Sequence, residues 1–163
     1  MKRISFFVII MLLYIGAFAQ QSVKIYDPSA DAKADVAAAL QLAKVDGKHV
    51  FLQIGGNWCP WCLRFNKFVH EDSRLDSLVK ANYEVVKINF SKENENRALL
   101  ATLDYPQRFG FPVFVILDSD GKRIHTQDSG LLEDGAVYSK EKIATMLTQW
   151  SADAMRKTIE KYK

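Results

Sequence analysis

The chain has 163 residues, of which 48% are hydrophobic and 25% charged, which suits one globular domain and is too short for two of ordinary size. Without Lys2 and Arg3 the formal charge of +3 falls to nearly zero, because 20 basic residues then face 19 acidic ones. This balance gives no reason to expect nucleic-acid binding, and two cysteines are too few for a domain supported by several disulfides.

The first 19 residues have the layout of a secretory signal peptide. Lys2 and Arg3 precede an uncharged apolar run over 4–18, and small residues mark a cleavage site after Ala19. This apolar run is too short for a membrane-spanning helix, which needs about 20 residues. We therefore expect residues 20–163 to form an exported, periplasmic domain without a membrane span. A leader that is retained as an N-terminal anchor is the alternative.

Hydrophobic periodicity and turn residues predict the first elements of the domain. In chain order these are a strand at 23–26, a helix opened by Asp27 and closed at Asp46, a strand at 49–54, a two-part helix at 60–70 and 72–81, a strand at 83–90 and a helix at 93–103. The strand at 49–54 is a mainly apolar run, which is typical of a strand buried on both faces.

The second half of the domain predicts a hairpin and a last helix. A strand at 111–117, the turn Asp120-Gly121 and a strand at 122–127 form the hairpin, and Ser139 caps the helix after a polar segment at 128–138. Strands that alternate with helices, followed by a hairpin, predict an α/β fold with a mixed sheet of four to five strands and helices on both faces. The cysteines then lie at the carboxyl end of a central strand.

The run Trp58-Cys59-Pro60-Trp61-Cys62 carries the expected chemistry. Two cysteines separated by two residues at a helix start can close a small disulfide ring with little backbone movement. The free amides and the dipole of a helix N-terminus favour an anion there. Cys59 is therefore expected to be an exposed, readily deprotonated nucleophile, and Cys62, one turn further, the resolving thiol.

Two other uses of the cysteine pair remain open from the residues alone. A zinc site would need two further ligands from His49, His70 and His125, which show no paired spacing. A purely structural disulfide would contribute little, because so small a ring removes little entropy from the unfolded chain. Redox chemistry is the favoured interpretation.

The pentapeptide after a buried strand, with Gly110-Phe111-Pro112 opening a later strand, resembles the thioredoxin family over about residues 24–150. The likeness is greatest to exported bacterial thiol-disulfide oxidoreductases with a WCxxC motif. It implies a thioredoxin fold, a redox-active Cys59–Cys62 disulfide, a cis-proline at Pro112 and a backbone contact from Phe111 to the incoming substrate. It implies no metal and no organic cofactor.

Three features depart from the family pattern. Pro60-Trp61 stands in place of Gly-Pro, the segment 128–138 has no counterpart in the minimal fold, and Gln53 occupies the position of a buried acid six residues before Cys59. A Gln amide cannot accept the proton of the resolving thiol. Gln53, and Lys87 on the neighbouring strand without its acidic partner, are therefore expected to modulate the resolving step.

Together these features predict an enzyme that exchanges disulfides with exported protein thiols. Trp58 and Trp61 are expected to form an apolar collar around the sulfurs that contacts an unfolded segment of the partner. We expect a monomeric reductase that is supplied by an unidentified electron donor. The alternatives are a disulfide isomerase, which usually dimerises through an added domain that this chain is too short to hold, and a non-catalytic binding module whose groove lies between Trp61 and Pro112.

Overall fold

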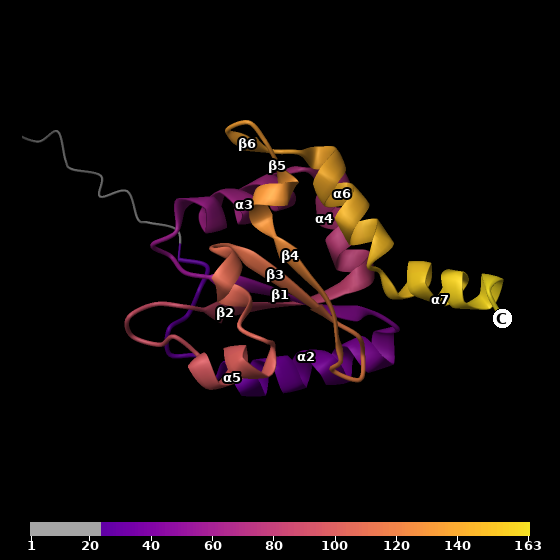
Figure 1. Cartoon of the computed structure of the whole chain (residues 1–163), viewed down its shortest axis with the longest axis horizontal. Coiled ribbons are helices and arrows are strands. Elements are labelled where there is room, and N and C mark those ends of the chain that lie inside the picture. The colour runs from indigo at the N-terminus through magenta and orange to yellow at the C-terminus, as the bar shows by residue number, and fades with distance from the viewer. Residues whose placement is uncertain (1–23) are drawn as a thin grey trace, which may run out of the picture.

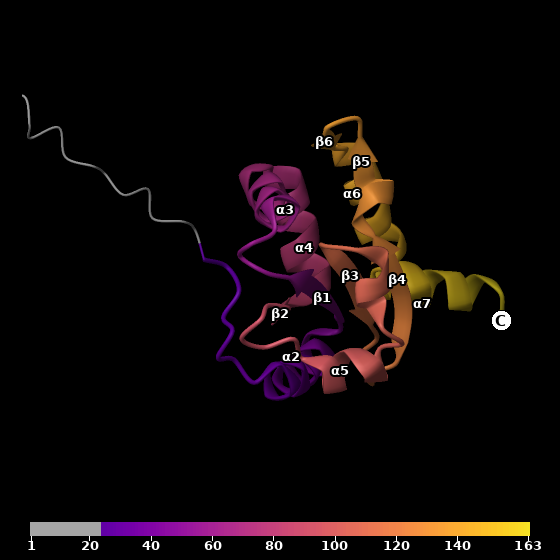
Figure 2. The ribbon, with the colours of Figure 1, turned by 60° about the vertical axis from the view of Figure 1, so that its left-hand side comes forward.

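A computed structural model of the chain describes residues 24–163, in which a central sheet lies between two layers of helices (Figures 1 and 2). The sheet has the order β2-β1-β3-β4, with β1 parallel to β2 and the other pairs antiparallel. Its strands are β1 (His49–Gly55), β2 (Tyr83–Asn89), β3 (Val113–Leu117) and β4 (Arg123–Asp128). The predicted mixed sheet is confirmed, with four strands. The predicted leader at 1–19 lies outside the described residues.

Helices cover both faces of the sheet, as predicted. The helices are α2 (Ala32–Asp46), α3 (Pro60–Glu71), α4 (Ser73–Asn82), α5 (Arg97–Thr102), α6 (Lys140–Gln149) and α7 (Ala152–Lys161). Helices α2 and α5 lie on one face, and α3, α4 and α6 lie on the other (Figure 1). Each layer buries its own apolar cluster against the sheet, so the sheet is the middle of a three-layer domain.

The central strand β1 positions the site. All seven of its residues are buried, and side chains alternate between the two faces. Leu52 and Ile54 belong to the cluster under α2, whereas Phe51 belongs to the cluster under α3. Gln53 lies two residues after Phe51, so its side chain points to the same face of the sheet. A polar side chain therefore enters the core on the α3 side, close to where that helix begins.

The predicted strand at 23–26 is wrong for the three residues of it that the structure describes. No strand forms there, because the side chain of Asn57 takes the place of a neighbouring strand. Its Oδ1 accepts hydrogen bonds from the backbone N–H of Ile25 at 2.8 Å and of Tyr26 at 3.1 Å, and its Nδ2 donates to the carbonyl of Tyr26 at 2.7 Å. The segment before α2 is thereby held against the loop that carries the cysteines.

Three helix boundaries also differ from the prediction. Asp31 rather than Asp27 caps α2, because its carboxylate accepts from the amides of the first turn. Helix α5 is shorter than predicted, since the backbone of Asn96 is left-handed with a φ of 50°. The last helix divides at Ser151, which caps a separate α7 that extends away from the domain and buries none of its residues (Figure 1). None of the helices within residues 24–163 combines the length and the apolar composition that crossing a bilayer requires.

Candidate active site

The two cysteines form a disulfide at the start of α3, with their Cα atoms 5.3 Å apart. Cys59 is the N-cap residue, and its Sγ accepts a hydrogen bond from the backbone N–H of Cys62 at 3.1 Å. Pro60 fills the first turn, where its missing N–H would have no helical partner. The predicted placement of both sulfurs at a helix N-terminus, where free amides favour a thiolate, is confirmed.

The expected exposure of the nucleophile is wrong for this disulfide form. Cys59 is 4% exposed and Cys62 is fully buried. Ile25, Trp61 and Phe111 pack against the buried cluster that contains both cysteines. Cys59 is still the more accessible of the two cysteines.

Gly55, the last residue of β1, lets the chain pass close to the sulfur of Cys62. A Cβ atom on Gly55 would lie 2.5 Å from the Sγ of Cys62 and 2.9 Å from the hydroxyl of Tyr26. Both distances are too short for a real side chain, so only glycine fits at this position. The lack of a side chain leaves the sulfur and the phenol facing the same small space.

An aromatic wall lies on one side of the disulfide. Trp58 is 56% exposed, donates its indole N–H to the carbonyl of Phe90 at 2.7 Å, and meets the ring of Phe111 edge to face at 5.5 Å between centroids. The Phe111–Pro112 peptide bond is cis, as the resemblance implied, and Pro112 is buried. Trp58 is thus a surface residue that borders the site, and not part of the core.

A second wall comes from the segment that the minimal fold lacks. Residues 128–138 contain a two-stranded hairpin, β5 (Glu133–Asp134) and β6 (Val137–Tyr138), that folds over α3. The ring of Tyr138 meets Trp61 edge to face at 5.3 Å between centroids. The guanidinium of Arg64 lies over the ring of Trp61 and donates to the carbonyl of Ala136 at 3.0 Å. The hairpin therefore fixes the orientation of Trp61.

Gln53 lies beneath the cysteines, where the sequence placed it. Its side chain is 2% exposed, and its Nε2 donates to the hydroxyl of Tyr26 at 2.8 Å and lies 3.4 Å from the carbonyl of Cys62. Lys87 pairs with Gln53 across β1 and β2 and donates to the side-chain oxygen of Asn66 at 2.8 Å. Burial lowers the pKa of Lys87. The lysine thus has a neutral partner in place of the expected acid.

Tyr26, Gly55, Asn57 and Asn66 were missed by the sequence reasoning. The Gly55-Gly56 pair after a buried strand was the one available signal, because paired glycines there indicate a close approach of the backbone to another group. The contacts of Tyr26 and Asn57 join positions more than thirty residues apart in sequence, and no local pattern encodes such a pairing.

The three histidines that a zinc site would use have other contacts. His49 Nδ1 lies 2.8 Å from the carbonyl of Trp150, His70 pairs with Asp76, and His125 stacks on Trp150. Within residues 24–163, no three His, Cys, Asp or Glu side chains gather as metal ligands would.

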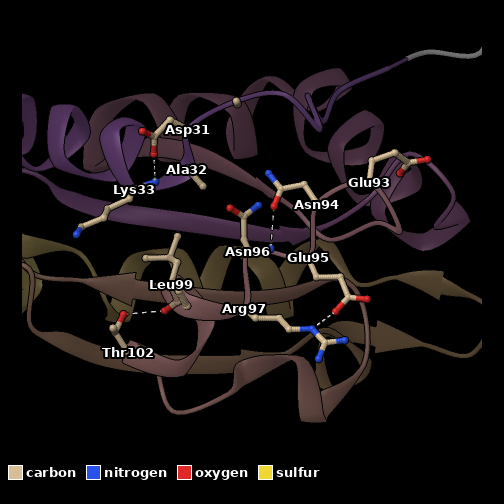
Figure 3. A pocket seen from close by; sticks show the side chains of 12 residues that line it. Asp31, Ala32, Lys33, Glu93, Asn94, Glu95, Asn96, Arg97, Leu99 and Thr102 are labelled. Carbon is tan, nitrogen blue, oxygen red and sulfur yellow. Dashed lines mark hydrogen bonds and ion pairs between the residues drawn. The ribbon is translucent and has the colours of Figure 1, made fainter.

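One cavity is separate from the cysteines. It measures about 910 Å³ and lies between the start of α2 and the loop before α5, lined by residues such as Asp31, Lys33 and Arg97 (Figure 3). A cavity of about 240 Å³ lies under α3 and is lined by Gln53, Lys87 and Asn66 among others. The smaller cavity therefore belongs to the polar group beneath the site, and the larger does not.

Substituting Gln53 with Asp is expected to speed the resolving step. A carboxylate at this position can accept the proton of Cys62, which an amide cannot do, and general acid-base help is worth about a hundredfold or more. Stopped-flow release of a mixed disulfide across pH measures the effect, and a new titration should appear in its profile. An equal or slower release by Gln53→Asp at every pH would refute this expectation.

Comparison with known proteins gives consistent relatives. A family model described as Thioredoxin-like matches residues 31–119. The disulphide isomerase of Xylella fastidiosa Temecula1 is 30% identical, with a TM-score of 0.69 over 78% of this chain and 96% of that one. Tryparedoxin of Trypanosoma brucei brucei is 29% identical over 123 residues, which are 76% of this chain and 75% of that protein. The oxidised C-terminal domain of DsbD from Neisseria meningitidis shares the fold, with a TM-score of 0.54 and 22% identity over 74% of this chain and 96% of that one.

Proposed function

We propose a direction and a location for the redox chemistry of this chain, which belongs to the thioredoxin-like family and is a thiol-disulfide oxidoreductase. In this proposal the chain works as a reductase of exported proteins. The observation that carries the exchange chemistry is the disulfide at the N-terminus of α3, with the Sγ of Cys59 hydrogen-bonded to a helix amide and Cys62 buried behind it. An amide that already points at the sulfur stabilises the thiolate that must attack.

The proposed reaction runs through a mixed disulfide. The thiolate of Cys59 attacks one sulfur of a substrate disulfide and expels the other substrate sulfur as a thiolate. Cys62 then attacks the Sγ of Cys59, re-forms the internal disulfide and releases the second substrate thiolate. Two electrons pass from the dithiol to the substrate, and a dithiol donor restores the reduced enzyme. Trp58, Trp61, Phe111 and Pro112 are proposed to receive the substrate segment around Cys59.

Residues 20–163 are expected to catalyse the reduction of insulin disulfides by dithiothreitol. The turbidity of the precipitating insulin chains measures the rate. The matched control is the same chain with both Cys59→Ser and Cys62→Ser, which should leave only the uncatalysed rate. A wild-type rate equal to that of this control would overturn the proposed reductase.

Disulfide isomerisation is the second candidate, because the 30% identical relative carries that name. The match spans 96% of that chain, so the argument that an isomerase requires a longer chain has little force. Isomerisation needs only attack by Cys59 and release by another substrate thiol. An isomerase would therefore reactivate ribonuclease with scrambled disulfides even as Cys62→Ser, whereas a reductase requires Cys62.

The exported location rests on the predicted leader. The chain recovered from cells is expected to begin at or near Gln20, because a signal peptidase would cut after Ala19. Intact-mass measurement of the secreted or periplasmic fraction checks this. A chain that retains Met1 to Ala19 in the membrane fraction would support the anchored alternative and leave the chemistry unchanged.

A further inference from the structure

Tyr26 contacts the active site from a segment that lies outside the sheet. Its side chain is 2% exposed and packs in one cluster with Cys59 and Cys62. Its hydroxyl and the Sγ of Cys62 face the same space above Gly55, at 2.9 and 2.5 Å from the position that a Cβ would occupy there. The phenol is therefore a polar group buried next to the resolving sulfur.

Two side chains fix the phenol in this position. Asn57 holds the backbone of Tyr26 at both its N–H and its carbonyl group. Gln53 donates its Nε2–H to the phenolic oxygen at 2.8 Å. Since Gln53 occupies a lone pair of that oxygen, the hydroxyl hydrogen of Tyr26 is left to donate elsewhere.

Burial raises the pKa of Tyr26 far above its ordinary value. The phenol therefore remains protonated over the whole range in which a thiol ionises, and it cannot act as the base that the family's acid would provide. A neutral hydroxyl in a buried site is instead a hydrogen-bond donor. Hydrogen bonds to a charged group are stronger than those between neutral groups.

We propose that Tyr26 is a positioning residue for the resolving step: once the internal disulfide is open, its hydroxyl donates a hydrogen bond to the thiolate of Cys62 and Gln53 orients that hydroxyl. This inference rests on the thiol-disulfide exchange described above. In the mixed disulfide the thiol of Cys62 loses its proton to water or to the departing thiolate, while the proton of Tyr26 stays on its oxygen. The stabilised thiolate attacks the Sγ of Cys59, and the substrate sulfur leaves with the electron pair of the broken S–S bond.

Other titratable groups lie near Tyr26 and Gln53. They are Cys59 at the N-cap of α3, Lys87 opposite Gln53 on β2, and Tyr138 on β6. Lys87 is bound to Asn66, and Tyr138 approaches the carbonyl of Trp61 at 3.3 Å. A test must therefore remove the hydroxyl of Tyr26 and keep these groups in place.

The test compares Tyr26→Phe with Tyr83→Phe. Tyr83 is also buried and donates its hydroxyl to the carbonyl of Leu147 at 2.7 Å, within the core cluster that α3, α4 and α6 cover. Both substitutions remove one buried hydroxyl, so a general loss of stability affects both. In a Cys59→Ser background, ultraviolet thiolate absorbance gives the ionisation midpoint of Cys62. Tyr26→Phe should raise this midpoint by about one pH unit or more, and Tyr83→Phe should leave it unchanged.

The kinetic readout uses the chain with both cysteines. Stopped-flow measurement separates the first attack by Cys59 from the resolving step. Tyr26→Phe should slow resolution by about threefold or more at neutral pH, because a tenfold loss of thiolate is partly offset by its greater nucleophilicity. The slowing should disappear at alkaline pH, where the thiol is ionised in either chain, and Tyr26→Phe should then resolve slightly faster because its more basic thiolate is the stronger nucleophile. The first attack should be unchanged.

An unchanged ionisation midpoint for Cys62 in Tyr26→Phe would overturn the proposal. So would an equal slowing in Tyr83→Phe, or a slowing that persists at alkaline pH, since each points to a packing role. None of these outcomes bears on whether the wild-type chain exchanges disulfides. A wild-type chain that forms no mixed disulfide would instead refute the exchange mechanism itself.

Discussion

Replacing Cys59 with Ser is expected to reduce catalysed disulfide reduction to the background rate. The thiolate of Cys59 is the group that attacks the substrate, and a hydroxyl at the same N-cap position does not ionise near neutral pH. Insulin reduction by dithiothreitol measures the loss. The fold should persist, because Ser is a favoured N-cap residue and can accept the hydrogen bond that the amide of Cys62 now donates to sulfur.

Circular dichroism of Cys59→Ser provides the control for folding. A correctly folded variant without activity supports the assignment of the nucleophile. A folded variant with full activity would show that a group other than Cys59 carries the reaction. The other cysteine of the chain is Cys62.

Replacing Cys62 with Ser is expected to trap the substrate on Cys59. The first attack survives in this variant, and the release step fails because no internal thiol remains to displace the substrate. Non-reducing electrophoresis and intact-mass measurement should detect a covalent adduct with a disulfide-containing protein, and dithiothreitol should dissolve it. The effect is large because resolution by an internal thiol is replaced by a slow reaction with external thiols.

Two outcomes would contradict this assignment. An adduct on Cys62 in the Cys59→Ser variant, with none on Cys59 in Cys62→Ser, would reverse the order of the two thiols. Turnover of insulin by Cys62→Ser at the wild-type rate would show that no resolving thiol is needed.

The local pattern of the sequence predicted most of the fold. The all-buried strand β1, the break between α3 and α4 at Asp72, and the hairpin around Gly121 all appear where hydrophobic period and turn chemistry placed them. The failed strand at residues 23–26 has a physical cause outside the local pattern. At residues 24–26 the backbone is bound by the side chain of Asn57, a long-range contact that strand propensity does not include.

The sequence predicted the cysteines and the position of Gln53, and the resemblance implied the cis bond at Pro112, but neither predicted the contacts of Tyr26 and Tyr138. The position of Gln53 follows from strand alternation, but its bond to Tyr26 depends on how the segment before α2 crosses the end of the sheet. For the hairpin of β5 and β6, the sequence indicates only a polar segment that has no counterpart in the minimal fold. Its contact with Trp61 is made by Tyr138, and no local hydrophobic periodicity indicates that Tyr138 is buried.

The reduction potential of the Cys59–Cys62 pair tests the central claim most directly, namely that this disulfide is a redox centre. Equilibration of residues 20–163 with glutathione or dithiothreitol buffers, followed by acid quenching and mass measurement of alkylated thiols, gives the value. We expect a potential between roughly −270 mV, typical of a reductase, and roughly −120 mV, typical of an oxidase. A potential below about −300 mV would identify an inert structural disulfide and contradict the account.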